Sequence, residues 1–194
     1  MAVFGLRDPD CTFIHIHKTG GSSIRKGVWG KRYDKAYHGE VPEHLRDQFS
    51  FAFVRHPLDR FVSVWKMFSD GTHNHPDWKR PEDARPLSVE ETFEIISDPD
   101  VIYDKRRSTF EEKIKHHAIP QTHPYNCLDA AKFVGRYERL NEDFARIAEI
   151  LGIETELPHY NYTVRRSWQE EIPDRMIAPL REYYRDDFER LGYE

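Results

Sequence analysis

Two short apolar runs, at residues 12–16 and 49–54, each precede a turn and a helical pattern. Their length and composition fit β-strands that are buried in a sheet. The first run leads into a glycine-containing turn at residues 18–21, and the second leads into residues 55–57, which end in a proline. A strand, a turn and a helix are therefore predicted in the same order twice.

The residues after each turn predict where the two helices begin. Ser22 and Ser23 carry the hydroxyls that are typical of helix N-caps, so a helix is expected to extend through about Val28. Pro57 suits the first turn of the second helix, because the N–H that proline lacks has no partner at that position. Each turn thus connects a buried strand to a helix N-terminus.

The later elements complete a pattern of strands that alternate with helices. We expect a long polar loop at residues 70–86, a helix from the capping box at 88–91 to about 96, a strand at 132–137, and helices at 141–151 and 174–191. Such alternation is typical of a three-layer α/β fold, in which helices flank a mainly parallel central sheet. Ligands of these folds bind beyond the carboxyl ends of the strands, where both turns are expected.

Composition narrows the class of protein. The 194 residues suit one domain spanning residues 1–194. The formal net charge of -5 argues against a general nucleic-acid binder, and no run of about 18 apolar residues predicts a transmembrane helix. Residues 1–8 lack the apolar run of a secretory signal, so we expect a cytoplasmic protein. Cys11 and Cys127 lie far apart in the sequence and outside any CxxC pair, which favours free thiols.

The first turn has the composition of an anion site. Glycines allow the backbone to approach a ligand closely, N–H groups at a helix N-terminus attract anions, and a lysine adds a full positive charge. The lysine precedes the glycines here, so the turn is not a Walker motif. A tight turn with a solvated lysine explains the pattern equally well. The residues concerned are Lys18, Thr19, Gly20, Gly21, Ser22 and Ser23.

The second turn offers a further phosphate contact. Arg55 lies at the mouth of the predicted helix and Ser63 lies about two turns into it. A guanidinium and a hydroxyl in this arrangement suit one phosphate group. Alternatively, Arg55 pairs with a carboxylate and Ser63 bonds to its own helix backbone.

Taken together, residues 18–23 and the pair Arg55 and Ser63 resemble the sulfotransferase family that uses 3′-phosphoadenosine 5′-phosphosulfate (PAPS). Residues 133–144 resemble a third block shared by that family. The segments at 161–166 and 184–193 resemble the closing segments of its carbohydrate, or Golgi-type, branch.

The resemblance implies a P-loop-like fold in which residues 18–23 hold the 5′-phosphosulfate while Arg55 and Ser63 hold the 3′-phosphate. Lys18 would stabilise charge on the leaving phosphate. Arg165 and Arg166 match a basic stretch that closes over the nucleotide, although a solvated charged turn is an equally simple interpretation. No metal is required, because a transferring sulfuryl group carries less negative charge than a phosphoryl group.

Transfer to a hydroxyl also needs a base, and histidine suits that task. The element Tyr37-His38-Gly39-Glu40 resembles the Tyr-His-Gly-His element of uronyl 2-O-sulfotransferases. The resemblance implies that His38 is the general base. Glu40 replaces the second histidine, so Glu40 is either an alternative base or the group that orients His38.

The expected activity is transfer of a sulfuryl group from PAPS to a hydroxyl acceptor, expected to be a carbohydrate or glycoconjugate. Gln121 and His123 are candidates to line the acceptor cleft, and Trp78 is a candidate to stack on a sugar ring. The chain's paired histidines lack the matched acid and spacing of a metal site. Two alternatives are a nucleotide-dependent kinase and a module that binds the nucleotide without catalysis.

Overall fold

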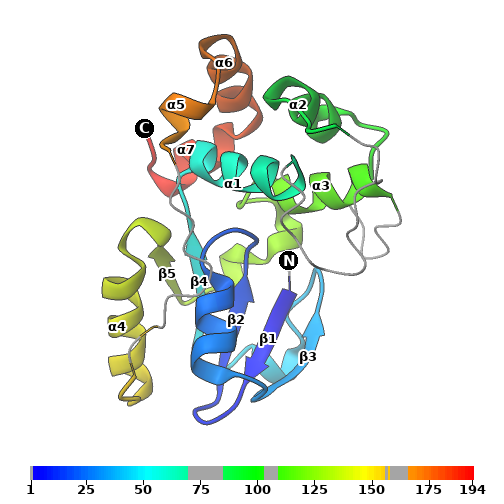
Figure 1. The fold of residues 1–194 in the computed structure, drawn as a ribbon. Coiled ribbons are helices and arrows are strands. Elements are labelled where there is room, and N and C mark those ends of the chain that lie inside the picture. Colours follow the sequence, from blue (N-terminus) through cyan, green and yellow to red (C-terminus); the bar gives the residue numbers. More distant parts are fainter. Residues whose placement is uncertain (1, 70–84, 103–108, 156, 158–165) are drawn as a thin grey trace. The chain divides into compact units, whose positions relative to one another are not determined.

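The computed structural model describes residues 2–69, 85–102, 109–155, 157 and 166–194 of the chain (Figure 1). The chain divides into two compact units. The first comprises Met1–His56 and Gln121–Val164, and the second comprises Pro57–Pro120 and Arg165–Glu194. A single sulfotransferase domain over residues 1–194 stays a prediction.

The first unit is built on a five-stranded sheet with the order β3-β1-β2-β4-β5. β2, β4 and β5 are parallel, whereas β1 is antiparallel to both of its neighbours, β2 and β3. The α/β class is therefore confirmed, but the sheet is mixed where a mainly parallel one was expected. The strands are β1 (Ala2–Leu6), β2 (Cys11–His15), β3 (Tyr33–Tyr37), β4 (Ser50–Val54) and β5 (Phe133–Arg136).

The inverted strand β1 arises from a tight hairpin. β1 and β2 pair from Ala2 opposite His15 to Leu6 opposite Cys11, and the turn between them contains Asp8 with a positive φ of 58°. A two-strand hairpin needs only a short connection, whereas a parallel pair needs a long crossover. Because β1 alone is inverted, the carboxyl ends of β2, β3, β4 and β5 lie at one edge of the sheet.

One face of the sheet carries the core of this unit. The helical segments here are the π-helical η1 (Ser23–Trp29), the short 3-10 turns η2 (Glu43–Leu45), η4 (Pro124–Asn126), η5 (Leu128–Ala130) and η6 (Tyr137–Arg139), and the helix α4 (Leu140–Leu151). Phe13 stacks on Phe51 with ring centroids 5.0 Å apart, and Trp29 of η1 meets Phe144 of α4 edge to face at 6.3 Å. Burial of each such side chain contributes about 1.5–3 kcal/mol. η1 and α4 are thereby fixed against the sheet.

The second unit is helical within its described residues. Its elements are α1 (Pro57–Ser69), α2 (Val89–Ser97), α3 (Phe110–Ala118), α5 (Trp168–Glu171), α6 (Asp174–Tyr183) and α7 (Arg185–Leu191). α1 begins at Pro57 as predicted, and α2 has the predicted capping box, in which the Ser88 side chain accepts from the Glu91 N–H. The predicted final helix is interrupted at Tyr184, whose buried hydroxyl donates to the Ala118 carbonyl over 2.8 Å. Trp78 and most of the expected loop at 70–86 lie outside the described residues.

A buried arginine joins two helices of this unit. Arg60 of α1 is 1% exposed, and its guanidinium donates to the carbonyls of His117, Ala118 and Ile119 at the end of α3. These carbonyls lack helical partners and form the negative end of the helix dipole, so they suit a cation.

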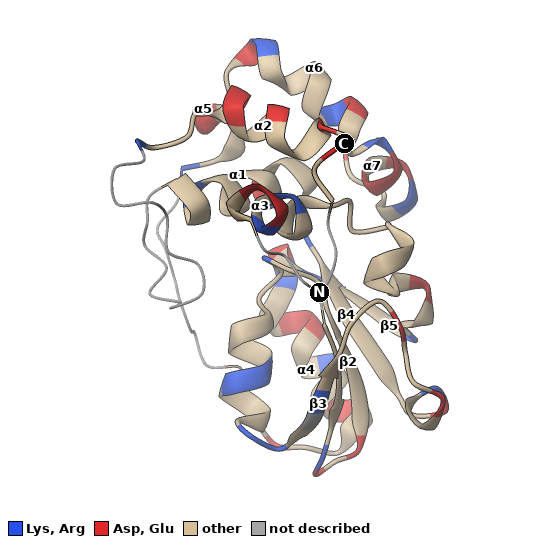
Figure 2. Cartoon of the chain, turned by 90° about the vertical axis from the view of Figure 1, so that its right-hand side faces the viewer, with Lys and Arg blue, Asp and Glu red and all other residues tan. Residues whose placement is uncertain are grey.

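Charged residues of both signs appear along the ribbons of α6 and α7 (Figure 2).

Candidate functional site

Four segments follow the carboxyl ends of the strands in the first unit. Residues 16–22 follow β2, residues 38–40 follow β3, Arg55 and His56 follow β4, and η6 follows β5. The topology therefore places the predicted anion loop, Arg55 and the predicted base at the same edge of the sheet. This is the edge at which α/β folds bind ligands.

The anion loop is closed by its own hydrogen bonds. Lys18 and Gly20 have positive φ angles of 69° and 88°. The buried Thr19 hydroxyl donates to the Ile16 carbonyl over 2.8 Å, and the Gly20 carbonyl accepts from the N–H of Ser23 over 3.0 Å. The Thr19 side chain therefore maintains the turn. Ser22 was expected to cap the following helix, but its backbone angles are already helical and its side chain makes no capping hydrogen bond.

Gly21 leaves no room for a side chain. A Cβ at this position would lie 2.1 Å from both Cδ2 and Nε2 of the His15 ring. The His15 ring in turn stacks on Phe13, with centroids 5.5 Å apart. The end of β2 thus forms an aromatic floor beneath the loop, and only glycine allows the backbone to lie so close to it.

The His15 ring is held in its neutral form. Removal from water is the main cause, and the positive charges of Arg25 and Lys18 add to it, so the pKa falls from 6.5 to about 3. The His15 ring therefore adds no positive charge beside Lys18 at neutral pH.

We expect the free energy of unfolding to fall as the pH decreases from about 6.5 towards 3, because only the unfolded chain binds a proton at His15 in that range. The stabilisation that comes from His15 is fully present above the pKa that His15 has in the unfolded chain, and it is lost as the pH falls below that value. Urea unfolding at a series of pH values measures the effect, and His15→Gln should have a smaller slope. The exposed His44 provides the control, His44→Gln. Equal slopes for wild type and His15→Gln would contradict the prediction.

Arg55 is held by residues from two other segments. The Gln121 side-chain amide bonds both backbone groups of Arg55, since Oε1 accepts from the N–H and Nε2 donates to the carbonyl, each over 2.8 Å. Beside it, Glu138 Oε1 accepts from the His56 N–H over 2.7 Å. Gln121 is 0% exposed, so it supports Arg55 and does not line a cleft as the sequence suggested.

Tyr137 connects the anion loop to Arg55. The Arg55 guanidinium carbon lies 4.3 Å from the centroid of the Tyr137 ring. A Cβ on Gly20 would lie 3.4 Å from Cδ2 of the same ring and 2.9 Å from the side chain of Leu140. One aromatic ring therefore contacts Arg55 and lies beside the predicted anion loop.

The other predicted nucleotide contacts belong to the second unit or lie outside the described residues. Ser63 lies in α1 of the second unit and is 2% exposed, whereas Arg55 belongs to the first unit. Their joint role therefore stays a prediction. Arg165 lies outside the described residues, and Arg166 is exposed at the start of the segment that leads into α5.

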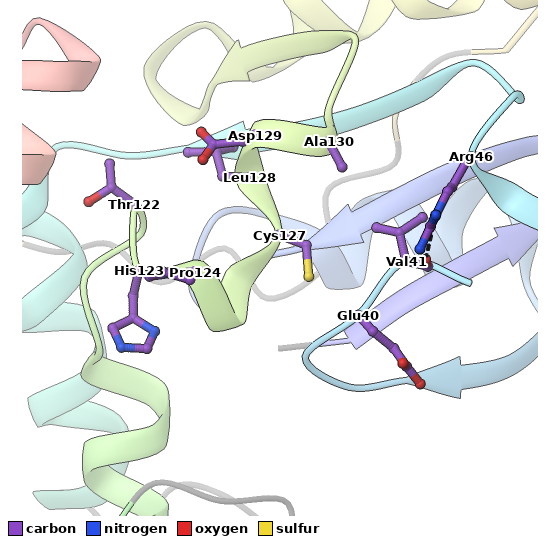
Figure 3. Close-up of a pocket in the computed structure, with 10 residues that line it drawn as sticks. All are labelled: Glu40, Val41, Arg46, Thr122, His123, Pro124, Cys127, Leu128, Asp129 and Ala130. Atoms are coloured by element: carbon purple, nitrogen blue, oxygen red, sulfur yellow. Dashed lines mark hydrogen bonds between the residues drawn. The ribbon is translucent and has the colours of Figure 1, made fainter. Parts of the chain in front are cut away.

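The predicted base lies beside a groove in the first unit. Gly39 has a φ of 78°, and a Cβ on it would lie 2.9 Å from the Tyr125 ring, so residues 38–40 pack closely against the segment after Gln121. His38 is half-buried. The groove has a volume of about 400 Å³, with Glu40, Val41 and Arg46 facing Thr122 to Ala130 across it (Figure 3).

The groove contains a histidine and a thiol. His123 Nδ1 accepts from the Tyr125 N–H over 3.1 Å, which assigns the proton of the neutral ring to Nε2, and burial lowers the pKa of His123. The pKa of the Cys127 thiol is raised, first by burial and then by the negative charge of Glu40. His123 therefore lines a groove, as the sequence suggested.

Tyr137, Glu138 and His15 were not singled out from the sequence as site residues. Tyr137 and Glu138 lie at the end of a correctly predicted strand, and that position was the available signal. The contacts that give them a role come from Gly20, Arg55 and His56, which are far away in the sequence.

Comparisons with known proteins identify the family to which the chain belongs. The chain matches the model of the sulfotransferase family over residues 13–194. The chain belongs to the sulfotransferase family. It is 26% identical over 216 residues to carbohydrate sulfotransferase 12 of Mus musculus, with 96% of this chain and 50% of that protein covered. This sulfotransferase-family chain thus spans about half the length of its curated relative, and no solved structure matches it.

These matches confirm the family resemblance and correct the predicted location. The mouse relative is a Golgi-type enzyme, which does not fit a cytoplasmic protein, so that prediction was wrong. It rested on the lack of an apolar run near residue 1, and such a lack does not determine where a protein resides. Within the described residues, no helix is long and apolar enough to cross a membrane. The same residues contain no group of three His, Cys, Asp or Glu side chains placed to hold a metal ion.

Proposed function

We propose that this sulfotransferase-family chain transfers a sulfuryl group from PAPS to a hydroxyl of a carbohydrate or glycoconjugate. The observation that carries the proposal is the position of the Tyr137 ring, which contacts Arg55 and lies beside Gly20, because it places the two predicted anion-binding segments close together at the carboxyl edge of the sheet. The family match and the mouse carbohydrate sulfotransferase support the chemistry.

The residues at this edge fit a nucleotide of this type. In this loop Gly21 packs closely against the His15 ring, a lysine supplies a positive charge, and N–H groups lie at the start of a helical segment. These features suit an oxyanion. We assign the phosphosulfate to Lys18, Thr19, Gly20, Gly21, Ser22 and Ser23, and the 3′-phosphate to Arg55 and Ser63, with Arg165 and Arg166 closing over the nucleotide. The parallel strands β2 and β4, with the loop directly after β2, support a P-loop-like arrangement.

The nucleotide would supply the activated sulfuryl group, and the protein's own residues would do the rest. Lys18 places a positive charge where negative charge develops on the leaving phosphate. We assign the removal of the acceptor hydroxyl proton to His38, and Glu40, two residues further on, either orients His38 or replaces it. The groove beside Glu40, which His123 also lines, would receive the acceptor. We propose that no metal is required.

Calorimetric titration with 3′-phosphoadenosine 5′-phosphate tests the donor site. We expect the wild type to bind it more tightly than ATP with magnesium, and Lys18→Ala and Arg55→Ala each to weaken binding by about 10- to 30-fold, because each removes a charged contact. Lys132→Ala is the matched control, since Lys132 is exposed and precedes β5 at the opposite edge of the sheet. Preference for magnesium ATP would favour a kinase, and binding without sulfate transfer to any carbohydrate would favour a non-catalytic module.

A further inference from the structure

Tyr137 occupies the point at which three segments meet in the first unit. It is the first residue of η6, directly after β5, and its side chain is 37% exposed. Its ring contacts the Arg55 guanidinium and lies beside Gly20 of the anion loop, where a Cβ on Gly20 would be 3.4 Å from it. A large, partly exposed aromatic ring in this place is not explained by the hydrophobic core, of which it is not a member.

The backbone on both sides of this contact is fixed. The Gln121 amide holds the N–H and carbonyl of Arg55, and the carboxylate of Glu138, the neighbour of Tyr137, holds the N–H of His56, the neighbour of Arg55. The end of β4 is therefore tied to Gln121 and, through Glu138, to the segment after β5 by hydrogen bonds that do not involve the Arg55 side chain. What remains to be set is the direction of the guanidinium, and the Tyr137 ring sets it.

Stacking restricts a flexible arginine without using its donors. The Arg55 guanidinium carbon lies over the Tyr137 ring, 4.3 Å from its centroid. A planar guanidinium that stacks on an aromatic ring keeps the N–H groups at its edge for a bidentate contact with an oxyanion. Free arginine side chains lose considerable rotamer entropy when they bind a ligand. A guanidinium that is already stacked loses less, so a phosphate is bound more tightly.

We propose that Tyr137 is a positioning residue that orients Arg55 and so sets the preference of the site for nucleotides with a 3′-phosphate. The proposal rests on the proposed function, in which Arg55 contacts that phosphate. Tyr137 itself acts through Arg55, and its hydroxyl is not needed for the effect.

The test compares the affinities of 3′-phosphoadenosine 5′-phosphate and adenosine 5′-phosphate, whose ratio measures the contribution of the 3′-phosphate. We expect Tyr137→Leu to lower this ratio by about 5- to 30-fold, and Tyr137→Phe, which keeps the aromatic face, to change it by less than about 2-fold. Thermal unfolding shows whether each variant is folded. If Tyr137→Leu does not fold, Tyr137→Met takes its place in the comparison.

A double-mutant cycle separates positioning from general damage. In the Arg55→Ala background, Tyr137→Leu should leave the ratio unchanged, because the residue through which it acts is absent. An unchanged ratio in Tyr137→Leu would overturn the proposal, whether the two affinities stay at their wild-type values or fall equally. An equal fall in both affinities would show an effect on the anion loop alone. Failure of the wild type to bind 3′-phosphoadenosine 5′-phosphate would instead contradict the proposed function.

Discussion

His38→Ala is expected to reduce the turnover number for sulfate transfer by about 10²- to 10⁴-fold while nucleotide affinity remains close to that of the wild type. The reason is that the acceptor hydroxyl must lose its proton during transfer, and His38 lies at the carboxyl end of β3, beside the groove that contains Glu40. Transfer of sulfate from labelled PAPS to a carbohydrate acceptor measures turnover, and calorimetry measures nucleotide affinity.

Glu40→Gln distinguishes the two roles left open for Glu40. If Glu40 orients His38, Glu40→Gln loses part of the turnover and the double variant is no slower than His38→Ala alone. If Glu40 is the base, Glu40→Gln is the slower single variant. His44→Ala is the control, because His44 is exposed and contacts Tyr37, the residue directly before His38. Full turnover in His38→Ala would rule out its role as the base.

Gly21→Ala is expected to weaken the binding of 3′-phosphoadenosine 5′-phosphate by about 10²-fold or more, since a loop displaced by about 1 Å no longer presents its N–H groups correctly. The added methyl group would lie 2.1 Å from the His15 ring, a distance that forces either the loop or the ring to move. Calorimetric titration of the variant against the wild type measures the change.

Gly152→Ala is the matched control for Gly21→Ala, because it also adds a methyl group to a glycine, but at the end of α4, where the added carbon would have no neighbour within 4 Å. A second control makes room for the methyl group, and Gly21→Ala combined with His15→Ser should recover part of the lost affinity. Unchanged affinity in Gly21→Ala would show that the loop is not the anion site, whereas loss without any recovery in the double variant would point away from the His15 contact.

Local patterns predicted most of the elements that carry the site. The apolar runs before residues 18 and 55 became β2 and β4, and the capping box at Ser88 and the glycine after Leu151 placed α2 and α4 correctly. These features depend on near neighbours in the chain. The strand β1 was missed because a five-residue apolar run is compatible with several structures, and its pairing with both β2 and β3 is decided by tertiary contacts.

The site was predictable only as far as its residues lie on recognisable turns. The glycines and lysine of residues 18–21 have a composition that suggests an anion site, and topology then brings Arg55 to the same edge. The contacts of Tyr137, the support that Gln121 gives to Arg55 and the floor that His15 forms beneath Gly21 depend on packing between distant segments. A side chain's neighbours across a sheet cannot be inferred from its neighbours in sequence.

The reversed direction of β1 affects how the protein should be prepared for these experiments. Ala2 pairs with His15, so the amino end of β1 lies at the edge that carries the anion loop. A purification tag joined ahead of residue 2 would emerge next to that loop, where a polyhistidine sequence competes for anions. Binding constants measured after such a tag has been removed are therefore the ones to compare between variants.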